Sequence, residues 1–246
     1  MRISAITACY NSRSTIENTI QSFLRQSHPD KELLVIDGGS TDGTLEILKR
    51  FNDSAIRVIS EADKGIYDAM NKGLANYVGD AIGFLNSDDA YHDETSLVKI
   101  AEALEKSDAV YGDLDMVRDH VTKKVVREWR AGDFTPGAFR NGWMPPHPTC
   151  YLRRGLVEKT GAFDLGYRIS ADYDFMLRAF ELHRPCVRYI PHVLVDFMVG
   201  GASTSGPFAV IRGNLECLKS RQRYLGAPIL DSAFVLKPLR KLTQVI

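Results

Sequence analysis

Residues 2–104 alternate short apolar runs with amphipathic segments, and this alternation limits the chain to few folds. The apolar runs have the length and composition of buried strands, whereas the segments between them place hydrophobic residues at the three- and four-residue spacing of helices. The runs cover residues 2–9, 32–36, 56–59 and 81–85. Strands that are separated by helices form right-handed βαβ units. The sequence therefore predicts an α/β fold with a mainly parallel central sheet that is flanked by helices.

Capping signals predict where two of these helices begin. The first helix is expected to start at Ser14, with Glu17 completing a capping box three residues later. Asp93 is expected to cap the helix that follows the fourth strand.

The sequence after residue 108 is less regular. Its strand-like and helix-like segments are residues 109–111, 149–152 and 187–190, a helix from near Asp172 and a helix after Pro207. Residues 127–141 are expected to be rich in loops, and residues 143–148 cannot form a helix because three prolines lie within four positions. We expect one domain over residues 1–205, followed by a helical extension over residues 206–246.

Composition and charge exclude several classes of protein. Hydrophobic residues make up 44% of the chain and charged residues 25%, which is typical of a folded globular protein and rules out intrinsic disorder. The 31 Lys and Arg residues balance the 31 Asp and Glu residues, so the chain lacks the basic excess of nucleic-acid-binding proteins and no nucleic acid partner is expected. No apolar run approaches the roughly 18 residues of a membrane-spanning helix.

The N-terminus and the cysteines favour a cytoplasmic protein. Residues 1–9 carry one positive charge and a short apolar segment, which is typical of a first strand and not of a signal peptide. The cysteines are far apart and form no CxxC pair, so we expect neither a zinc site nor a redox motif. Free thiols in a reducing compartment are the simplest interpretation of Cys9, Cys150, Cys186 and Cys217.

Polar or acidic residues follow three of the predicted strands. They are residues 9–11, 37–39 and 86–89. In parallel α/β sheets, ligands bind in the crevice beyond the carboxyl ends of the strands. We therefore expect these residues to line one crevice.

Asp88 and Asp89 are adjacent carboxylates that follow a buried strand. Two such groups repel each other unless a positive charge lies beside them, and oxygen ligands suit Mg²⁺ or Mn²⁺. Alternatively, both carboxylates cap the following turn and point into water. The pair alone does not decide between these interpretations.

Asp37 also has two interpretations. An Asp before two glycines can form an Asx-turn. Alternatively, its carboxylate accepts a hydrogen bond from the N3–H of uracil or thymine, or from the N1–H and amino group of guanine. The neighbouring glycines match neither a dinucleotide fingerprint nor a P-loop.

Four further residues carry both a structural and a chemical interpretation. Asp172 and Asp174 lie where a helix is predicted to begin, which stabilises carboxylates, but one of them could also act as a general base. His147 lies among prolines, either as an acceptor-site or phosphate-site group or as a surface histidine. Tyr10 follows the first strand, where it either stacks on a base or packs in the core.

Four motifs in order resemble those of a known enzyme family. Residues 6–11, 35–44 and 84–89 resemble the successive nucleotide-sugar motifs of the family 2 inverting glycosyltransferases. Residues 63–73 are similar to those of a branch devoted to bacterial surface polysaccharides. The resemblance covers roughly residues 1–200.

The resemblance implies a GT-A (Rossmann-like) fold. About residues 1–110 would bind the nucleotide sugar, and about residues 111–205 would contribute the acceptor side and the catalytic base. The turn after the first strand would hold the base and ribose, Asp37 would read the base, Lys64 would lie near the base or diphosphate, and Asp88 would face the ribose and donor. The residues thus implied in nucleotide-sugar binding are Ala8, Tyr10, Asn11, Asp37, Lys64 and Asp88.

The resemblance also implies the catalytic and metal-binding residues. Asp89 would bind Mn²⁺ or Mg²⁺ on the diphosphate, and Asp172 would be the catalytic base. The family usually has an acidic residue directly before the base, whereas this chain has Ala171, which puts any contribution from that position in doubt. Trp143 and His147 are expected on the acceptor side because they follow the sheet.

The implied activity is the metal-dependent, inverting transfer of a hexosyl or N-acetylhexosaminyl group. A UDP-sugar is the preferred donor, and dTDP- and GDP-sugars satisfy the same hydrogen-bonding logic. The acceptor would be a hydroxyl of a saccharide or a lipid-linked saccharide in polysaccharide biosynthesis. The Gln-x-x-Arg-Trp motif of the processive members is absent, which favours single addition.

The sequence leaves two alternative functions and the roles of two segments undecided. A catalytically idle nucleotide-sugar-binding module would keep the donor pocket but not the base. A sugar nucleotidyltransferase would need a glycine-rich basic loop after the first strand, and residues 10–14 contain no glycine. Residues 234–242 mix basic and apolar side chains, either as a peripheral contact with an anionic membrane or as an ordinary tail. Residues 198–203 form either a loop that closes over the donor or a glycine turn.

Overall fold

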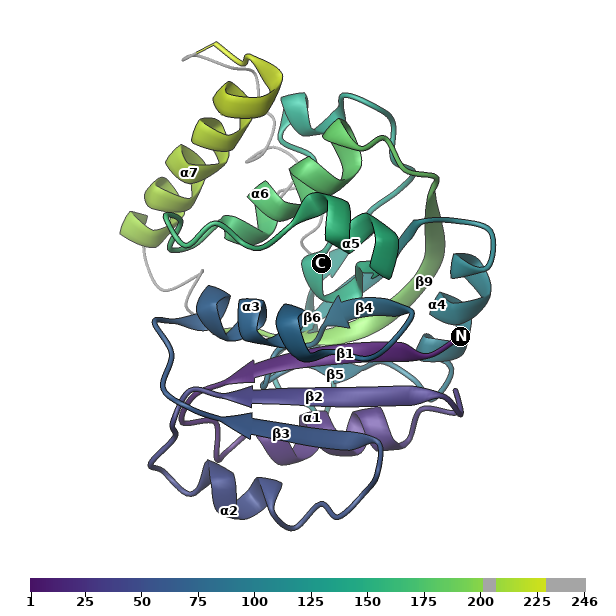
Figure 1. Ribbon diagram of the computed structural model, residues 1–246, viewed down its shortest axis with the longest axis vertical. Coiled ribbons are helices and arrows are strands. Elements are labelled where there is room, and N and C mark those ends of the chain that lie inside the picture. The colour runs from purple at the N-terminus through teal and green to yellow at the C-terminus, as the bar shows by residue number, and fades with distance from the viewer. Residues whose placement is uncertain (201–206, 229–246) are drawn as a thin grey trace.

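The computed structural model describes residues 1–200 and 207–228 (Figure 1). Its N-terminal half contains four parallel strands in the order β3-β2-β1-β4. They are β1 (Ile3–Cys9), β2 (Lys31–Asp37), β3 (Ile56–Ser60) and β4 (Ala81–Phe84). This confirms the four strands that the apolar runs predict.

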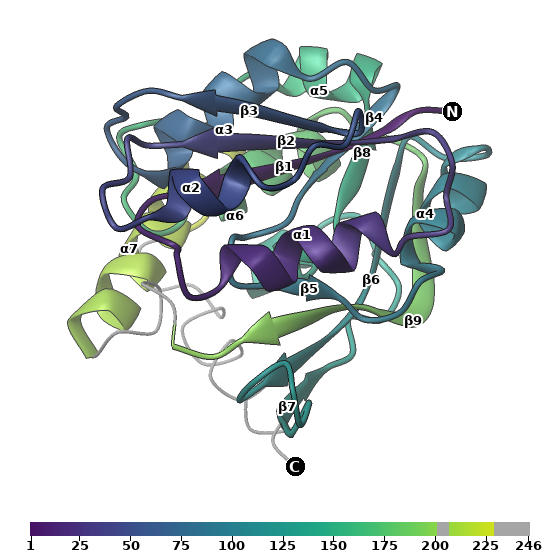
Figure 2. The ribbon, with the colours of Figure 1, turned by 90° about the horizontal axis from the view of Figure 1, so that it is seen from below.

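Helices cover both faces of these strands. Alternate side chains of a strand point to opposite faces: Ile6 of β1 packs with Met70 of one helix, whereas Ile3 packs with Ile16 of another. Figure 2 shows α3 on one face of the sheet and α1 on the other. The helices of this half are α1 (Ile16–Leu24), α2 (Thr44–Leu48), α3 (Ile66–Asn76) and α4 (Ser96–Leu104).

The second half extends the sheet with mixed pairing. Among the described residues, the sheet has the order β3-β2-β1-β4-β8-β6-β9-β5, with β7 paired to β6. β8 is antiparallel to β4 and β6, and β6 is parallel to β9 and antiparallel to β7. The added strands are β5 (Ala90–Tyr91), β6 (Ala109–Val117), β7 (Val125–Trp129), β8 (Tyr151–Arg153) and β9 (Val187–Met198). The sheet is therefore wholly parallel in its first half and mixed in its second half.

The helices of the second half pack on the face that carries α3. They are the 3₁₀ helices η1 (Ala138–Asn141) and η2 (His147–Thr149), the α-helices α5 (Arg154–Thr160), α6 (Ala171–Leu177) and α7 (Pro207–Leu225), and the π-helical turn η3 (Arg178–Leu182). α7 packs against α6, where Ser220 donates a hydrogen bond to Asp174. The helix expected after Pro207 is therefore present.

Several local predictions were wrong. α1 begins at Ile16 after Thr15 and has no side-chain cap, so Ser14 and Glu17 form no capping box. Residues 147–149 form a 3₁₀ turn despite the prolines, because proline is tolerated in the first turn of a helix. The sequence patterns also missed β5, β7 and α5.

Two predicted segments fall wholly or partly outside the described residues. They are residues 234–242 and half of the segment at residues 198–203. Within residues 1–200 and 207–228, no helix combines the length and the apolar character that crossing a membrane requires.

Candidate active site

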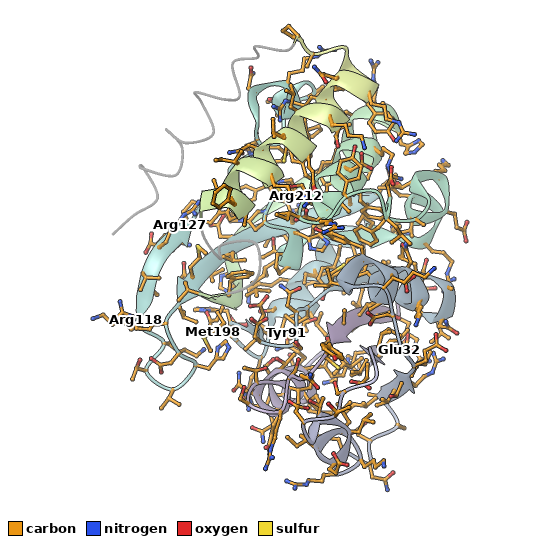
Figure 3. All side chains as sticks on the ribbon, turned by 90° about the vertical axis from the view of Figure 1, so that its left-hand side faces the viewer. Glu32, Tyr91, Arg118, Arg127, Met198 and Arg212 are labelled. Atoms are coloured by element: carbon orange, nitrogen blue, oxygen red, sulfur yellow. The ribbon has the colours of Figure 1, made fainter. Side chains whose placement is uncertain are left out.

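A cavity of about 990 Å³ lies where the two halves of the sheet meet. It is bounded by the ends of β1 and β4, by α3, β7, η2 and the start of α6, and by one face of α7. In Figure 3, Arg127 marks β7 and Arg212 marks α7. Of the residues predicted from the sequence, those that line the cavity are Ala8, Asp88, Trp143, His147 and Asp172.

The structure separates the two carboxylates at the start of α6. Asp172 is partly exposed and lines the cavity. Asp174 is fully buried and accepts hydrogen bonds from Arg178 Nε and Ser220 Oγ, both at 2.9 Å. Asp174 therefore joins α6 to η3 and α7, and Asp172 is the carboxylate that a substrate can reach.

Two residues hold the segment that carries Asp172. The Tyr67 hydroxyl donates to the carbonyl oxygen of Ile169 at 2.6 Å and lies 3.5 Å from Asp172 Oδ1. Glu216 of α7 accepts hydrogen bonds from the backbone N–H groups of residues 168–170. Burial alone would raise the pKa of Glu216, but these hydrogen bonds outweigh it and hold that pKa below its ordinary value. α7 therefore fixes the loop that precedes Asp172.

His147 is a buried, neutral group in the cavity wall. Its ring stacks on Phe84 at a centroid distance of 5.2 Å, and its Nε2 atom has no hydrogen-bond partner among the described residues. Burial lowers the pKa of His147, and the charge of Asp172 only partly opposes this effect. Trp143 lies in the same wall with its Nε1 donating to the carbonyl oxygen of Ala131 at 3.1 Å. His147 therefore offers a ring nitrogen to a polar group in the cavity.

Asp88 and Asp89 face different surroundings. Asp88 lines the cavity, and burial raises the pKa of its carboxyl group, with a smaller opposing effect of His120. Asp89 is fully buried and accepts hydrogen bonds from Met198 N at 3.0 Å and from Asn86 Nδ2 at 2.7 Å. Both oxygens of Asp89 thus tie the end of β4 to the end of β9, and the metal role expected for Asp89 stays a prediction.

The described residues contain no preformed metal centre. No group of three or more His, Cys, Asp or Glu side chains in residues 1–200 and 207–228 is arranged to hold a metal ion.

Asp37 forms the Asx-turn that one of its two interpretations predicts. It is fully buried and accepts hydrogen bonds from Gly39 N, Ser40 N and Ser60 Oγ. Burial favours a raised pKa, but the hydrogen bonds from Ser40 and Ser60 outweigh it and lower the pKa of Asp37. These bonds stabilise the turn that follows β2, and the base-binding role expected for Asp37 stays a prediction.

The other predicted nucleotide-binding residues lie beside the cavity. Tyr10 is 62% exposed at the end of β1. Asn11 adopts a left-handed backbone with φ 51°, and its Oδ1 accepts a hydrogen bond from Thr41 N at 2.9 Å. Lys64 is exposed in the loop before α3. Tyr10 and Lys64 are therefore open to a ligand, whereas the Asn11 side chain joins the loops after β1 and β2.

Sequence reasoning missed several residues of this site. Arg127 and Trp129 line the cavity from β7, and Arg130 lines it directly after that strand. The Val-Val-Arg-Glu-Trp sequence of β7 has the β-branched and aromatic content that could have identified the strand. No local sequence pattern identifies Glu216 as a site residue, because its hydrogen-bond partners lie about 47 residues earlier in the chain.

The fold and the cavity define a class of protein. The parallel half opens its strand ends into a cavity, and the mixed half brings Asp172 to that same cavity, in the GT-A glycosyltransferase fold. The chain belongs to glycosyl transferase family 2, whose sequence model matches residues 4–161. The predicted α/β fold class and family are thereby confirmed.

Known proteins support the same assignment. The PGL/p-HBAD biosynthesis glycosyltransferase of Mycobacterium bovis (strain BCG / Pasteur 1173P2) is 33% identical over 199 residues, which cover 78% of this chain and 74% of the relative. S. aureus TarS 1-349 in complex with UDP-GlcNAc gives a TM-score of 0.69 at 18% identity, over 91% of this chain and 73% of TarS. The mannosyltransferase PcManGT from Pyrobaculum calidifontis in complex with GDP-Man and Mn²⁺ gives 0.67 at 19% identity, over 95% and 66%. At these identities the two structures demonstrate a shared fold.

Proposed function

We propose that this protein is an inverting glycosyltransferase that moves a hexosyl or N-acetylhexosaminyl group from a nucleotide diphosphate to an acceptor hydroxyl. The observation that carries the proposal is that Asp88, from the parallel half, and Asp172, from the mixed half, line one cavity. Asp88 would hold the cation that binds the leaving diphosphate, and Asp172 would accept the proton of the attacking hydroxyl. Relatives that bind UDP-GlcNAc or GDP-Man in the same fold support a nucleotide-sugar donor.

Asp172 would act as the general base. Its carboxylate takes the proton of the acceptor hydroxyl while that oxygen attacks the anomeric carbon from the face opposite the diphosphate. The new C–O bond forms as the bond to the diphosphate breaks, so the configuration inverts in one displacement. Tyr67 and Glu216 would keep Asp172 in place during this step, because both hold the segment at residues 168–170.

Asp88 would hold Mn²⁺ or Mg²⁺ together with oxygens of the donor diphosphate. The fit is supported by the chemistry of the site: Asp88 is a carboxylate in a cavity wall whose burial disfavours an uncompensated charge. Mg²⁺ is commonly held by one or two carboxylates plus substrate phosphates, which suits a site with a single accessible Asp. When bound, the cation would supply positive charge to the departing diphosphate.

The proposal extends to donor, acceptor and location. UDP is the preferred nucleotide, with Tyr10 and Lys64 beside the base and Ala8 beside the sugar. Trp143 and His147 would contact the acceptor, a saccharide or lipid-linked saccharide of a surface polysaccharide. A cytoplasmic enzyme with peripheral membrane contact through residues 234–242 would meet such an acceptor at the membrane.

Donor turnover tests the proposal. Release of nucleoside diphosphate from a panel of UDP-, dTDP- and GDP-sugars is measured with Mn²⁺ or with EDTA, beside calorimetric binding of each donor. We expect slow, metal-dependent release from one nucleotide class. Binding without release, even with acceptor extracts added, would instead identify a catalytically idle nucleotide-sugar-binding module, and binding of no donor by the folded protein would refute the proposal.

A further inference from the structure

Helix α7 leaves a row of large apolar side chains uncovered. Phe208, Ile211 and Leu215 are 86%, 57% and 54% exposed. Their spacing of three and four residues places them on one face of the helix. The opposite face, with Cys217 and Ser220, is buried against the rest of the protein. Figure 1 shows α7 at the outer edge of the molecule, so this apolar row faces away from the core.

Basic side chains continue the same face toward the end of α7. Arg212, Lys219 and Arg223 are all exposed and follow the apolar row at helical spacing. Arg212 and Arg223 each pair with a carboxylate, at 3.1 Å and 3.2 Å, whereas Lys219 has no ion pair with any residue that the structure describes. The apolar row and these three cations are together called the outer face of α7.

A further cation lies next to this face. Arg168 is exposed and has no ion pair with the described part of the chain. Its backbone N–H donates to Glu216 of α7 at 3.1 Å, which places it beside the helix. Four cations therefore lie along or beside the outer face, and only two carboxylates, Glu216 and Asp164, pair with them. This surroundings of the apolar row is thus positively charged.

The same helix is a wall of the active-site cavity. Ala209, Gly213 and Asn214 line the cavity from α7. Val210 and Ile66 also line it and are themselves exposed, so the opening of the cavity is bordered by apolar side chains. The cavity therefore opens next to the helix that carries the apolar row.

The charges favour a lipid bilayer over a second copy of this chain as the partner of this face. In a two-fold dimer the same face would meet itself. Parallel helices would then bring cations against cations, and antiparallel helices would bury Lys219 against the apolar row, which is costly for a charge without a partner. At a membrane, by contrast, apolar side chains enter the acyl boundary while basic side chains contact anionic headgroups.

We propose that the outer face of α7 docks onto an anionic phospholipid bilayer, so that the cavity opens at the membrane surface. This contact is formed by Phe208, Ile211, Leu215 and Lys219 and is separate from the contact proposed for residues 234–242. Docking itself does not depend on the reaction. The entry of a lipid-linked acceptor from the bilayer into the cavity rests on the proposed function.

Vesicle co-sedimentation of the full chain tests the docking. We expect binding to phosphatidylcholine vesicles that contain phosphatidylglycerol, and weaker binding when salt is added. Phe208→Ser combined with Ile211→Ser should weaken this binding about 100-fold, because each inserted side chain contributes about 10-fold. Lys219→Gln should weaken it about 5-fold, and only for vesicles with the anionic lipid.

Val78→Ser is the matched control. Val78 is also an exposed apolar residue, but it precedes β4 and so lies at the amino end of that strand, whereas the cavity lies at the carboxyl end. Its substitution should leave vesicle binding unchanged. Calorimetric binding of a nucleotide-sugar donor should be the same in the double variant as in the wild type, because neither Phe208 nor Ile211 lines the cavity.

Four outcomes would contradict the docking or the proposed function separately. Wild-type vesicle binding by the double variant, or no vesicle binding by the wild type, would overturn the docking and leave the proposed function intact. A wild-type dimer that becomes monomeric in the double variant, measured by sedimentation velocity, would assign the outer face to a second copy instead. A double variant that unfolds more easily but binds vesicles normally would show that the face packs on the chain itself. Normal vesicle binding without binding of any donor would refute the proposed function alone.

Discussion

Substitution of Asp172 by asparagine is expected to lower the rate of sugar transfer by about 10²–10⁴-fold, the usual contribution of a general base. Asparagine preserves the size of the side chain but cannot take the proton of an acceptor hydroxyl. Donor binding should change little, since the diphosphate is assigned to Asp88. The measurement is nucleoside diphosphate release by the variant, together with calorimetric binding of the same donor.

Asp174→Asn is the matched control for this substitution. It changes the same chemical group two residues away, on the same helix, but at a buried site that bonds Arg178 and Ser220. We expect it to lower the free energy of unfolding by about 1–3 kcal/mol, because it disrupts buried hydrogen bonds. Asp172→Asn with wild-type turnover, or Asp174→Asn as the variant that abolishes turnover in a stably folded protein, would show that Asp172 is not the base.

Asp88→Asn is expected to remove most of the metal-dependent part of donor binding. Loss of the hydrogen-bond partners of a metal ligand already costs about 10–100-fold in metal affinity, so loss of the ligand itself should cost at least about 100-fold. The measurement is donor binding with Mn²⁺ and with EDTA, for the variant and the wild type. Because burial raises the pKa of Asp88, the metal-dependent part should also weaken on acidification at a higher pH than for an ordinary aspartate.

Asp89→Asn separates the roles of the two adjacent carboxylates. The new NH₂ group of the asparagine is a donor and would lie against another donor, either Met198 N or Asn86 Nδ2. One buried hydrogen bond would be lost, so we expect the free energy of unfolding to fall by about 1–3 kcal/mol. Metal-dependent binding by the remaining folded protein should persist. If metal dependence instead disappears in Asp89→Asn and survives in Asp88→Asn, then Asp89 is the metal ligand after all.

The sequence predicts the parallel half of the fold well because each of its strands is a continuous apolar run. Ile3–Cys9 and Lys31–Asp37 are buried on both faces, so local composition alone marks them. β7 is half-buried throughout and, within the part of the chain that the structure describes, pairs with β6 alone, so it lacks such a run. α5 is a short helix whose Arg-Gly start carries no capping signal.

The candidate site shows the same limit at the level of single residues. Motif order identifies Asp88, Asp89, Asp172 and Asp37 as a set, but not which carboxylate is accessible. The surroundings of each carboxylate depend on distant partners: Met198, 109 residues away, donates a hydrogen bond to Asp89, and Ser60 donates one to Asp37.

The most direct test of a single displacement with Asp172 as the general base is the anomeric configuration of the sugar that is first released. An α-linked donor is incubated with the protein and Mn²⁺ without acceptor, so that water takes the place of the hydroxyl, and the anomeric proton of the product is followed by ¹H NMR before mutarotation. One displacement predicts that the β-anomer appears first and that Asp172→Asn abolishes its formation. Initial release of the α-anomer would contradict an inverting mechanism with Asp172 as its base.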